Sequence, residues 1–361
     1  MRIMKLVLPM IPRFTLILAG STLLGLLQGA SPEELPRYRI PRNITPAYPN
    51  PVRGETIRPR VLELLGLGEL PTAVSFKKEN SETTSDGLSV TTLSFQNSLG
   101  ETVPGVLITP VGAGTDSLPG VVCMPGTGGD AARMTEARFY RDGQDEGPLM
   151  GWARELARRG FATLSITLKG TVARRRVFED WDREARLLAP YGRSQMGFLV
   201  EEALSAARVL ARQPMVDAQR IGLTGFSLGG YAAWWAAACD PSIAASAPLC
   251  GGLGSLALDI HDGDPDRQSS FHYVPGLLRY FDHPKIVASC IAPRPLMLLA
   301  PLHDPDMPAS GIDQLLRVAN PAYLKAGHPE KFKVYRPNDG HVFRVEYFEW
   351  MAEWFHSSLV K

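Results

Sequence analysis

Regular alternation of apolar and polar positions marks the stretch that follows residue 72. The runs 72–79, 88–96 and 103–110 are rich in β-branched residues, and Gly, Ser, Asp and Asn separate them. A period of two turns one side of a strand toward a core and the other toward water. These runs therefore predict three neighbouring strands that form an antiparallel lead-in.

Further along the chain, short apolar runs alternate with longer segments of helical period. Strands are predicted at 119–124, 161–168, 220–226, 243–250, 294–301 and 331–337, and helices at 148–160, 197–213, 231–238 and 345–359. Alternating β and α elements of this length imply a mostly parallel sheet with helices on both faces. The predicted fold class is therefore α/β, in one large domain over 55–361.

The stretch 251–286 interrupts this alternation, and it predicts an insertion that caps the domain or forms a pocket wall. It contains the aspartates Asp259, Asp262, Asp264 and Asp266. They lack the ligand spacing of a calcium loop, so a solvated surface loop is the favoured interpretation. Ring-bearing residues expected at the pocket are Phe271, His272, Tyr273 and Trp181.

Residues 1–30 have the pattern of a secretory signal. Basic residues precede an apolar run over 14–27, and small residues follow it. An uncleaved membrane anchor is the alternative, although the run is short for a span of about 20 residues. We therefore expect a secreted or periplasmic protein that contacts a membrane only if this segment stays attached. The Pro-rich residues 31–54 predict an extended arm, and 58–67 predict a short helix.

Charge gives little sign of a polyanionic partner. Apolar residues make up 45% of the chain, and the formal net charge is +1. This balance gives no reason to expect nucleic acid as a partner. A run of three arginines, Arg174, Arg175 and Arg176, could meet an acidic substrate, but a solvated helix face is favoured.

The four cysteines are Cys123, Cys239, Cys250 and Cys290. An exported protein could pair them in disulfides. Their apolar surroundings instead favour free, buried thiols. No two of them have the close spacing of a zinc or redox site.

The motif Gly225-Phe226-Ser227-Leu228-Gly229 lies between a predicted strand and a predicted helix. In that context it predicts a sharp turn that presents Ser227 as a nucleophile at the carboxyl end of the sheet. Close approach of strand and helix leaves no room for side chains at the flanking positions, and glycine fits there. A glycine-rich turn with an incidental serine is the alternative.

A serine hydroxyl needs a base, and in this fold the acid and the histidine follow the nucleophile in that order. Asp304 follows the apolar strand 294–301 and is predicted to be the acid that orients the imidazole. Asp306 is the alternative, and it could instead cap the next helix. His303 fits a loop residue better than a base.

His341 is predicted to be the base, because it lies on a glycine-containing loop after the last predicted strand. His328 precedes that strand, and His356 lies in the final helix, so both are less suitable. The oxyanion of the intermediate needs two N–H donors. The backbone N–H of Leu228 and that of Thr127 are predicted, with Gly126 next and a simple glycine turn as the alternative.

The stretch 119–130, PGVVCMPGTGGD, resembles the strand and HGTGG loop of bacterial esterases related to acetyl xylan esterases and dienelactone hydrolases. The resemblance continues to about residue 358, and it extends to hydrolase domains of the prolyl-oligopeptidase type. It implies an α/β-hydrolase fold and a Ser–Asp–His esterase with its triad on Ser227, Asp304 and His341. Pro125 replaces the loop histidine, and LKGT replaces an acidic or arginine-bearing turn after the third parallel strand.

The expected reaction is cleavage of a carboxylic ester of a small molecule or carbohydrate through an acyl-enzyme, with no metal or organic cofactor. Peptide or lactone hydrolysis is the alternative, although the N-terminal segment is too short for the propeller that such peptidases carry. Ser227 counts against a dehalogenase, which needs an aspartate at that position. A non-catalytic binding module is the remaining alternative.

Overall fold

The computed structural model describes residues 40–41, 44, 54–115, 117–141, 148–175, 178–264 and 267–360. The chain divides into the units Met1–Pro41 and Arg42–Lys361, and the account below concerns the second. The predicted signal at 1–30 lies outside the described residues, as does nearly all of the predicted arm at 31–54. In the described part of the chain, no helix combines the length and the apolar character that crossing a membrane requires.

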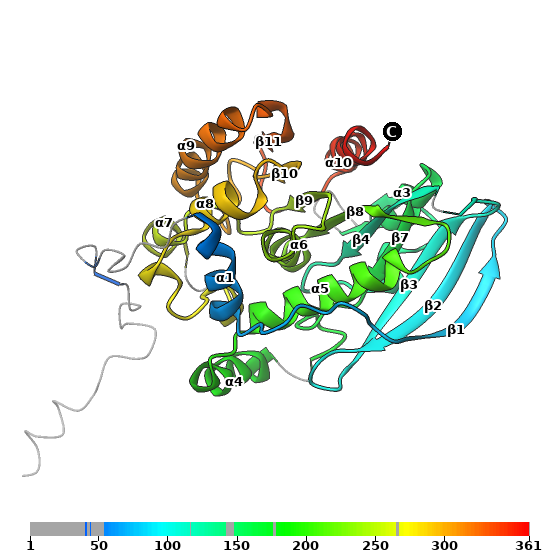
Figure 1. Ribbon diagram of the computed structural model, residues 1–361, viewed down its shortest axis with the longest axis horizontal. Coiled ribbons are helices and arrows are strands. Elements are labelled where there is room, and N and C mark those ends of the chain that lie inside the picture. The colour runs from blue at the N-terminus through cyan, green and yellow to red at the C-terminus, as the bar shows by residue number, and fades with distance from the viewer. Residues whose placement is uncertain are drawn as a thin grey trace, which may run out of the picture. The chain divides into compact units, whose positions relative to one another are not determined.

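A nine-stranded sheet in the order β1-β2-β3-β7-β4-β8-β9-β10-β11 forms the centre of this unit (Figure 1). Its strands are β1 Phe76–Thr83, β2 Leu88–Gln96, β3 Thr102–Pro110, β4 Leu118–Met124, β7 Ala162–Ile166, β8 Val216–Phe226, β9 Ala245–Leu249, β10 Leu296–Leu299 and β11 Phe332–Tyr335. Strands β1 to β3 pair antiparallel, β3 joins β7 antiparallel, and the pairs from β7 to β11 are parallel. The predicted α/β class and the antiparallel lead-in are therefore confirmed.

The helices of the described residues are α1 Ile57–Leu65, α2 Ala131–Met134, α3 Trp152–Arg158, α4 Phe178–Leu188, α5 Gln195–Ala211, α6 Leu228–Cys239, α7 Leu256–Asp262, α8 His283–Ile286, α9 Ala309–Lys325 and α10 Val345–Leu359. Short 3₁₀ turns lie at Gly54–Thr56, Ala189–Tyr191, Ser270–His272, Leu277–Arg279 and Pro329–Lys331, and a π turn at Val287–Ile291. The strands β5 Tyr140–Arg141 and β6 Leu149–Met150 form a separate ribbon.

Glycines in the central strands show which helix covers each face. A Cβ on Gly120 of β4 would meet Leu210 of α5 at 2.9 Å, and one on Gly222 of β8 would meet Phe355 of α10 at 2.6 Å. Gly120 is paired with Ile221, the neighbour of Gly222, and successive residues of a strand point to opposite faces. Helices α5 and α10 therefore cover opposite faces of the sheet.

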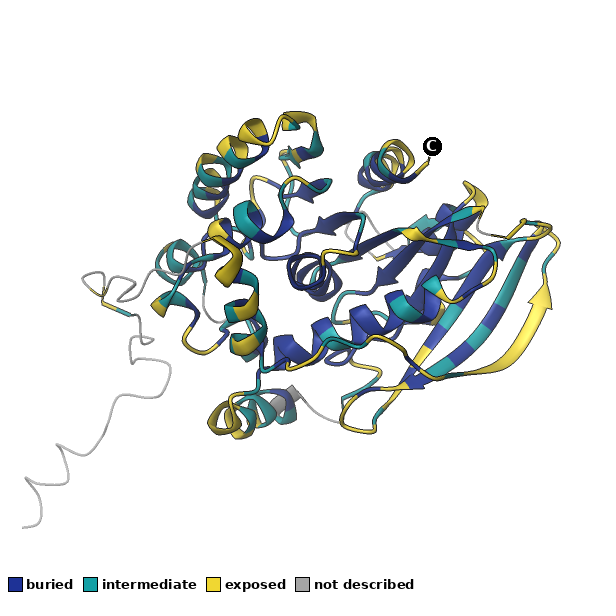
Figure 2. Cartoon of the chain, in the orientation of Figure 1, coloured by how far each residue is buried: buried dark blue, intermediate teal, exposed yellow. Residues whose placement is uncertain are grey.

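Burial follows the topology (Figure 2). Strands β7 and β9 are buried at every residue, as expected for parallel strands covered on both sides, whereas β1 is exposed along nearly its whole length. This contrast places the core at the parallel part of the sheet, and the loops described next follow β4, β8, β10 and β11 of that part.

Some predicted elements differ from the structure. The helix predicted at 148–160 begins only at Trp152, because β6 and the left-handed Gly151 (φ 69°) occupy its first residues. The acidic stretch is not a solvated loop throughout: Asp259 lies in α7, where its carboxylate contacts Nε2 of the buried His272 at 2.8 Å. Asp262 accepts a hydrogen bond from Ser310 (2.6 Å), and Asp266 lies outside the described residues.

Candidate active site

Ser227 occupies the turn between β8 and α6 with φ 52° and ψ −118°. A positive φ is rare for a residue with a side chain and costs conformational energy. The backbone keeps this conformation because the N–H of Ser227 donates to the carbonyl of Leu249 (2.9 Å) and its carbonyl accepts from Tyr231 (3.0 Å). The hydroxyl is thereby presented at the carboxyl end of the sheet.

The flanking glycines are required by contact distances. A Cβ on Gly225 would lie 2.5 Å from the backbone of Gly229 and 2.6 Å from the carbonyl oxygen of Met124. A Cβ on Gly229 would lie 2.3 Å from the same oxygen. Both distances are far below van der Waals contact, so α6 can approach β4 and β8 this closely only without side chains at these positions.

Asp304 and His341 meet across the loops that follow β10 and β11. Nδ1 of His341 lies 3.0 Å from each carboxylate oxygen of Asp304, whose side chain is fully buried. A carboxylate at Nδ1 fixes the tautomer in which Nε2 is unprotonated and can accept a proton. The structure thus brings together the predicted acid and the predicted base.

Asp306 is a second carboxylate at the same imidazole, 3.4 Å from Nδ1. Its other oxygen pairs with Nε of Arg267 at 2.8 Å, and its N–H donates to Asp304 (2.9 Å). It does not cap the next helix as the sequence suggested, because Pro308 holds that position in α9. Asp306 therefore contributes charge beside His341 rather than a helix cap.

The charges around His341 outweigh its burial. Burial lowers the pKa of the imidazole, whereas the hydrogen bond and charge of Asp304 and the charge of Asp306 raise it, and Arg267 lowers it. The net result is a pKa above the ordinary histidine value. Such a base gains its proton at a higher pH than a free imidazole.

Asp339 anchors the loop of His341 and was not identified from the sequence. It pairs with Arg344 and accepts a hydrogen bond from the hydroxyl of Tyr347 (2.7 Å). Its carbonyl accepts from the N–H of His303 (2.9 Å), which links the loop to that of Asp304. The pKa of Asp339 is lowered to about 2, chiefly by the bond from Arg344.

The other histidines weighed as the base have different partners. His303 contacts the side-chain oxygen of Asn338 at 2.8 Å in an exposed position. His328 lies 3.5 Å from Glu330, and His356 is exposed on α10. None of these three lines the cavity described next, which fits their predicted lesser suitability as base.

Ser227 and His341 line one cavity of about 390 Å³. Its polar wall is the loop 125–129 together with Arg133, and its apolar wall is formed by Met134, Pro148, Leu149, Met150, Trp152, Phe226, Val342 and Phe343. The ring of Phe226 packs on the imidazole of His341 with centroids 4.9 Å apart. The candidate nucleophile and base therefore face a mostly apolar space.

None of the described residues in the stretch 251–286 lines this cavity. The prediction that this stretch forms a wall of the pocket is therefore wrong for the cavity of Ser227. Its rings pack elsewhere: Phe271 contacts Trp181 and Tyr231 at centroid distances of 6.2 and 5.1 Å, and His272 contacts Tyr231 at 5.3 Å. The segment reaches the site at Asp306, whose carboxylate pairs with Arg267 and whose backbone carbonyl accepts a hydrogen bond from the side chain of Gln268 (3.3 Å).

The two predicted oxyanion donors come from the start of α6 and from the loop after β4. Leu228 is the first residue of α6, where a backbone N–H has no partner within its own helix. Thr127 and Gly126 line the cavity, and a Cβ on Gly126 would lie 3.4 Å from that of Ser227. Thr127 thus lines the same cavity as Ser227 and Leu228 follows Ser227 directly, while the role of either N–H as an oxyanion donor stays a prediction.

Arg174 corrects the interpretation of the arginine run. It lies in a loop rather than a helix, its side chain is only 10% exposed, and its NH1 pairs with Glu202 at 2.6 Å. It is therefore neither a solvated helix residue nor available to a substrate. Arg175 also lies in this loop, half-buried, and Arg176 is outside the described residues.

All four cysteines are free and buried, which confirms the favoured interpretation. Cys250, which follows β9 with φ 50°, offers its sulfur near the acid–base pair. Among the described residues, Cys250, Asp304 and His341 form one group whose candidate metal-ligating atoms lie within 4.8 Å of one another. Nδ1 of His341 and the carboxylate of Asp304 hydrogen-bond to each other, so these ligand atoms already have a partner within the protein.

The sheet order and the strained serine turn between a strand and a helix define an α/β-hydrolase. The chain belongs to the Abhydrolase family, which matches residues 98–342. The family-level resemblance inferred from the sequence is confirmed, and the chain is a hydrolase.

Individual relatives agree with this assignment. A Bacillus subtilis (strain 168) protein named "Putative hydrolase YtaP" is 31% identical over 217 residues, which cover 59% of this chain and 71% of that protein. Among solved structures, an acetyl xylan esterase from Paenibacillus sp. is 20% identical with a TM-score of 0.61, covering 87% of this chain and 97% of that one. A glucuronoyl esterase from Solibacter usitatus is 14% identical with a TM-score of 0.62, covering 90% and 99%. At these identities the two structures show the shared fold alone.

Proposed function

We propose that this hydrolase cleaves a carboxylic ester through an acyl-enzyme formed on Ser227. One observation carries the proposal: the strained Ser227 lines the same cavity as His341, whose Nδ1 lies 3.0 Å from the buried Asp304. A hydroxyl, an imidazole and a carboxylate in this order of contact are the elements of nucleophilic acyl transfer.

In the proposed cycle, Oγ of Ser227 attacks the ester carbonyl while Nε2 of His341 takes its proton. The tetrahedral oxyanion accepts hydrogen bonds from the N–H groups of Leu228 and Thr127. His341 then protonates the departing alcohol, and the acyl group remains on Ser227. A water that gives its proton to His341 hydrolyses the acyl-enzyme, and Asp304 stabilises the imidazolium at each step.

The proposed substrate is an acyl ester of a carbohydrate or a small alcohol. Support comes from the names of the structural neighbours, which are acetyl xylan esterases and glucuronoyl esterases. The apolar side of the cavity, including Leu149, Met150 and Trp152, suits an acyl group with hydrocarbon character. No observation favours a peptide or a lactone, and both serve as outcomes of the test.

The test measures kcat/KM on p-nitrophenyl acetate, longer p-nitrophenyl esters, acetylated xylan, a lactone and peptide anilides. We expect ester turnover that falls at least about 10⁴-fold in Ser227→Ala, because the oxyanion donors alone retain only residual catalysis. Ser357→Ala is the matched control, since that hydroxyl donates to a carbonyl within α10 (2.9 Å).

A fluorophosphonate probe followed by peptide mapping locates the reactive serine independently of the substrate. Labelling at Ser227 in the wild type, lost in Ser227→Ala, is expected. An adduct on another serine, or ester turnover that survives Ser227→Ala, would overturn the assignment. Turnover of anilides in place of esters would make the protein a peptidase.

We also propose that residues 1–30 direct export, on the basic–apolar–small pattern of that segment. Expression of the full chain in a bacterial host, followed by N-terminal sequencing of the protein from the periplasm, tests it. A new N-terminus just after residue 30 is expected. Recovery of the intact chain in the membrane fraction would instead favour an anchor.

A further inference from the structure

The loop 125–130, which carries the proposed oxyanion donor Thr127, has a proline at its first position. Pro125 offers neither an N–H nor a polar side chain to hold the loop. Within the loop, the carbonyl of Gly126 accepts from the N–H of Gly129 (3.0 Å). The C=O and N–H of a trans peptide point in opposite directions, so this bond turns the N–H of Thr127 away from Gly129. The direction of the donor therefore depends on where the whole loop is held.

Two hydrogen bonds hold the loop from a neighbouring segment, residues 167–174, which we call the support segment. The N–H of Val172 donates to the carbonyl of Thr127 (2.9 Å). The N–H of Ala131, at the exit of the loop, donates to Oγ1 of Thr167 (3.1 Å). The first contact joins two backbone groups, and the second depends on a single side chain, that of Thr167.

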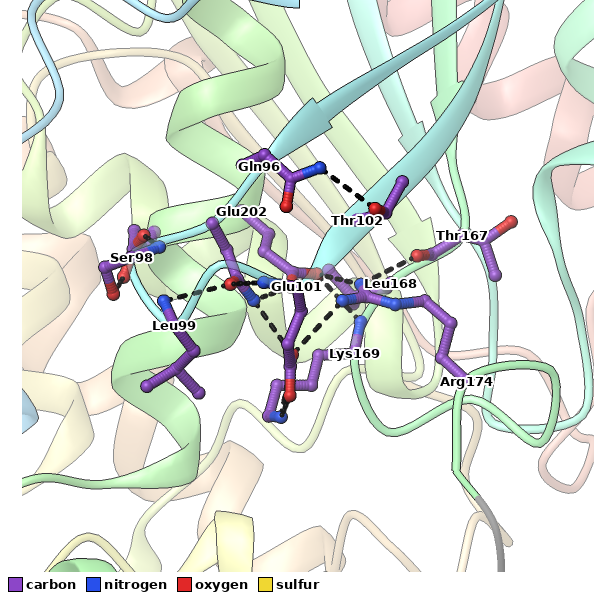
Figure 3. A network of polar contacts seen from close by, with 12 residues as sticks. Gln96, Ser98, Leu99, Glu101, Thr102, Thr167, Leu168, Lys169, Arg174 and Glu202 are labelled. Carbon is purple, nitrogen blue, oxygen red and sulfur yellow. Dashed lines mark hydrogen bonds and ion pairs between the residues drawn. The ribbon is translucent and has the colours of Figure 1, made fainter.

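The support segment is in turn fixed by the carboxylate of Glu202 on α5 (Figure 3). One oxygen of Glu202 accepts from the backbone N–H of Lys169 (2.8 Å) and from NH1 of Arg174 (2.6 Å). Its other oxygen accepts from Asn97 (2.9 Å). NH1 of Arg174 also donates to the carbonyl of Thr167 (3.0 Å), so Glu202 and Arg174 together clamp the start of the segment.

The cluster around Glu202 is buried and highly charged. The side chain of Glu202 is 0% exposed, that of Arg174 10% and that of Lys169 8%. Lys169 also pairs with Glu101 at 2.8 Å and with Glu184 at 3.0 Å. Buried ion pairs gain little net stability over apolar packing, because desolvation offsets their attraction. The cluster therefore contributes more to the position of its members than to stability, and through Lys169, Arg174 and Thr167 it fixes the position of the support segment.

We propose that Thr167, Arg174 and Glu202 are positioning residues for the oxyanion loop, replacing the anchor that Pro125 cannot provide. The inference rests on the proposed function, because it assigns a role to Thr127 as donor. The three residues touch no substrate. They act by keeping the N–H of Thr127 where negative charge develops on the oxyanion.

Thr167→Val is the decisive variant, with Thr167→Ser as its matched partner. Valine keeps the shape and removes Oγ1, whereas serine keeps the hydroxyl and removes a methyl group. We expect Thr167→Val to lower kcat on p-nitrophenyl acetate by about 10- to 100-fold with KM nearly unchanged, since misplaced donors weaken transition-state binding alone. Thr167→Ser should stay within about threefold of the wild type.

Glu202→Gln tests the buried carboxylate that holds the support segment. It should lower kcat in the same way, whereas Ser98→Ala should leave kcat unchanged. The hydroxyl of Ser98 donates to Glu201 (2.6 Å), which precedes Glu202 in α5, and Ser98 has no contact with the support segment among those described above. A melting temperature for each variant separates a loss of fold from a loss of position.

Hydrogen–deuterium exchange on peptides covering 125–134 supplies a readout besides turnover. Exchange should quicken in Thr167→Val and stay at the wild-type rate in Thr167→Ser. Equal kcat and equal exchange in the two variants would overturn the positioning role while leaving ester hydrolysis intact. Absence of ester turnover in the wild type would instead overturn the proposed function, and this inference with it.

Discussion

The nucleophile turn, residues 225–230, and the loops of Asp304 and His341 are held by opposite means. The turn is held by backbone contact, with Gly225 and Gly229 against the carbonyl of Met124. The two loops share a backbone bond from His303 to Asp339, but their side chains are held mainly by charged partners, among them Arg267 on Asp306. The turn has no space for an added side-chain atom. In the two loops, removal of a charged side chain leaves its buried partner without a hydrogen bond.

The turn therefore sets the position of the proposed nucleophile, and the two loops set the orientation and charge of the proposed acid and base. Steric confinement fixes Ser227 in one strained conformation, so its position is set once α6 packs on β8 beside β4 and β9. The acid–base pair needs partners from three separate loops, and its chemistry depends on their charges. Substitutions in the turn should therefore affect folding first, and substitutions in the loops should affect rate or pH dependence first.

The largest effect is expected from Asp304→Ala. Its carboxylate lies 3.0 Å from Nδ1 of His341 through both oxygens, and its loss leaves the imidazole without orientation. We expect kcat/KM on p-nitrophenyl acetate to fall about 10³- to 10⁴-fold. Asp306→Ala, the matched variant, should lose less than about 10-fold. Equal losses in both variants would make the two carboxylates a shared acid.

Gly229→Ala should break the turn itself. The added methyl group would lie 2.3 Å from the carbonyl oxygen of Met124, and backbone must move to admit it. We expect a loss of about 3 kcal/mol in the free energy of unfolding, measured by urea denaturation. Gly68→Ala, where nothing lies within 4 Å, is the control and should change stability little. A fully stable Gly229→Ala protein would contradict the steric account.

A smaller effect is expected from Asp339→Ala, which releases the loop of His341 from Arg344 and Tyr347. We expect kcat to fall about 10-fold, because a base displaced from its contact distance transfers a proton less efficiently. Asp313→Ala removes an exposed partner of Arg336 on α9 and serves as the control. An unchanged kcat in Asp339→Ala would show that the loop is held by its backbone.

The finest distinction concerns pH. The active base is the neutral imidazole, so kcat/KM rises as pH passes the pKa of His341. The charge of Asp306 raises that pKa and Arg267 lowers it. Asp306→Asn should therefore move the acidic limb of the profile to lower pH, and Arg267→Gln should move it to higher pH. Shifts of the same sign in both variants would contradict this electrostatic account.

The site follows from sequence where its causes are local. A glycine-flanked serine between a strand and a helix predicts the turn at Ser227. Chain order and the position after a strand lead to His341 and to Asp304, with Asp306 as the alternative acid. Their roles stay predictions until activity is measured, but the contact of Asp304 with His341 is the one that chain order requires.

The supporting contacts could not be predicted, because they join distant parts of the chain. Arg174 and Glu202 lie 28 positions apart, and Asn97 and Glu202 lie 105 apart. An arginine run gives no sign that one member will be buried on a carboxylate of another element. Helix α9 was expected only as the next helix that Asp306 could cap, without bounds, and the structure shows that it continues through Pro321.

The four free, buried thiols can report unfolding of the protein. Burial raises the pKa of each one, that of Cys290 to about 11, so little thiolate forms at neutral pH in the folded chain. A thiol reagent should stay silent on the native protein and count four groups once it unfolds. A single cysteine introduced on the exposed strand β1 would then take a fluorophore alone, with no native cysteine removed.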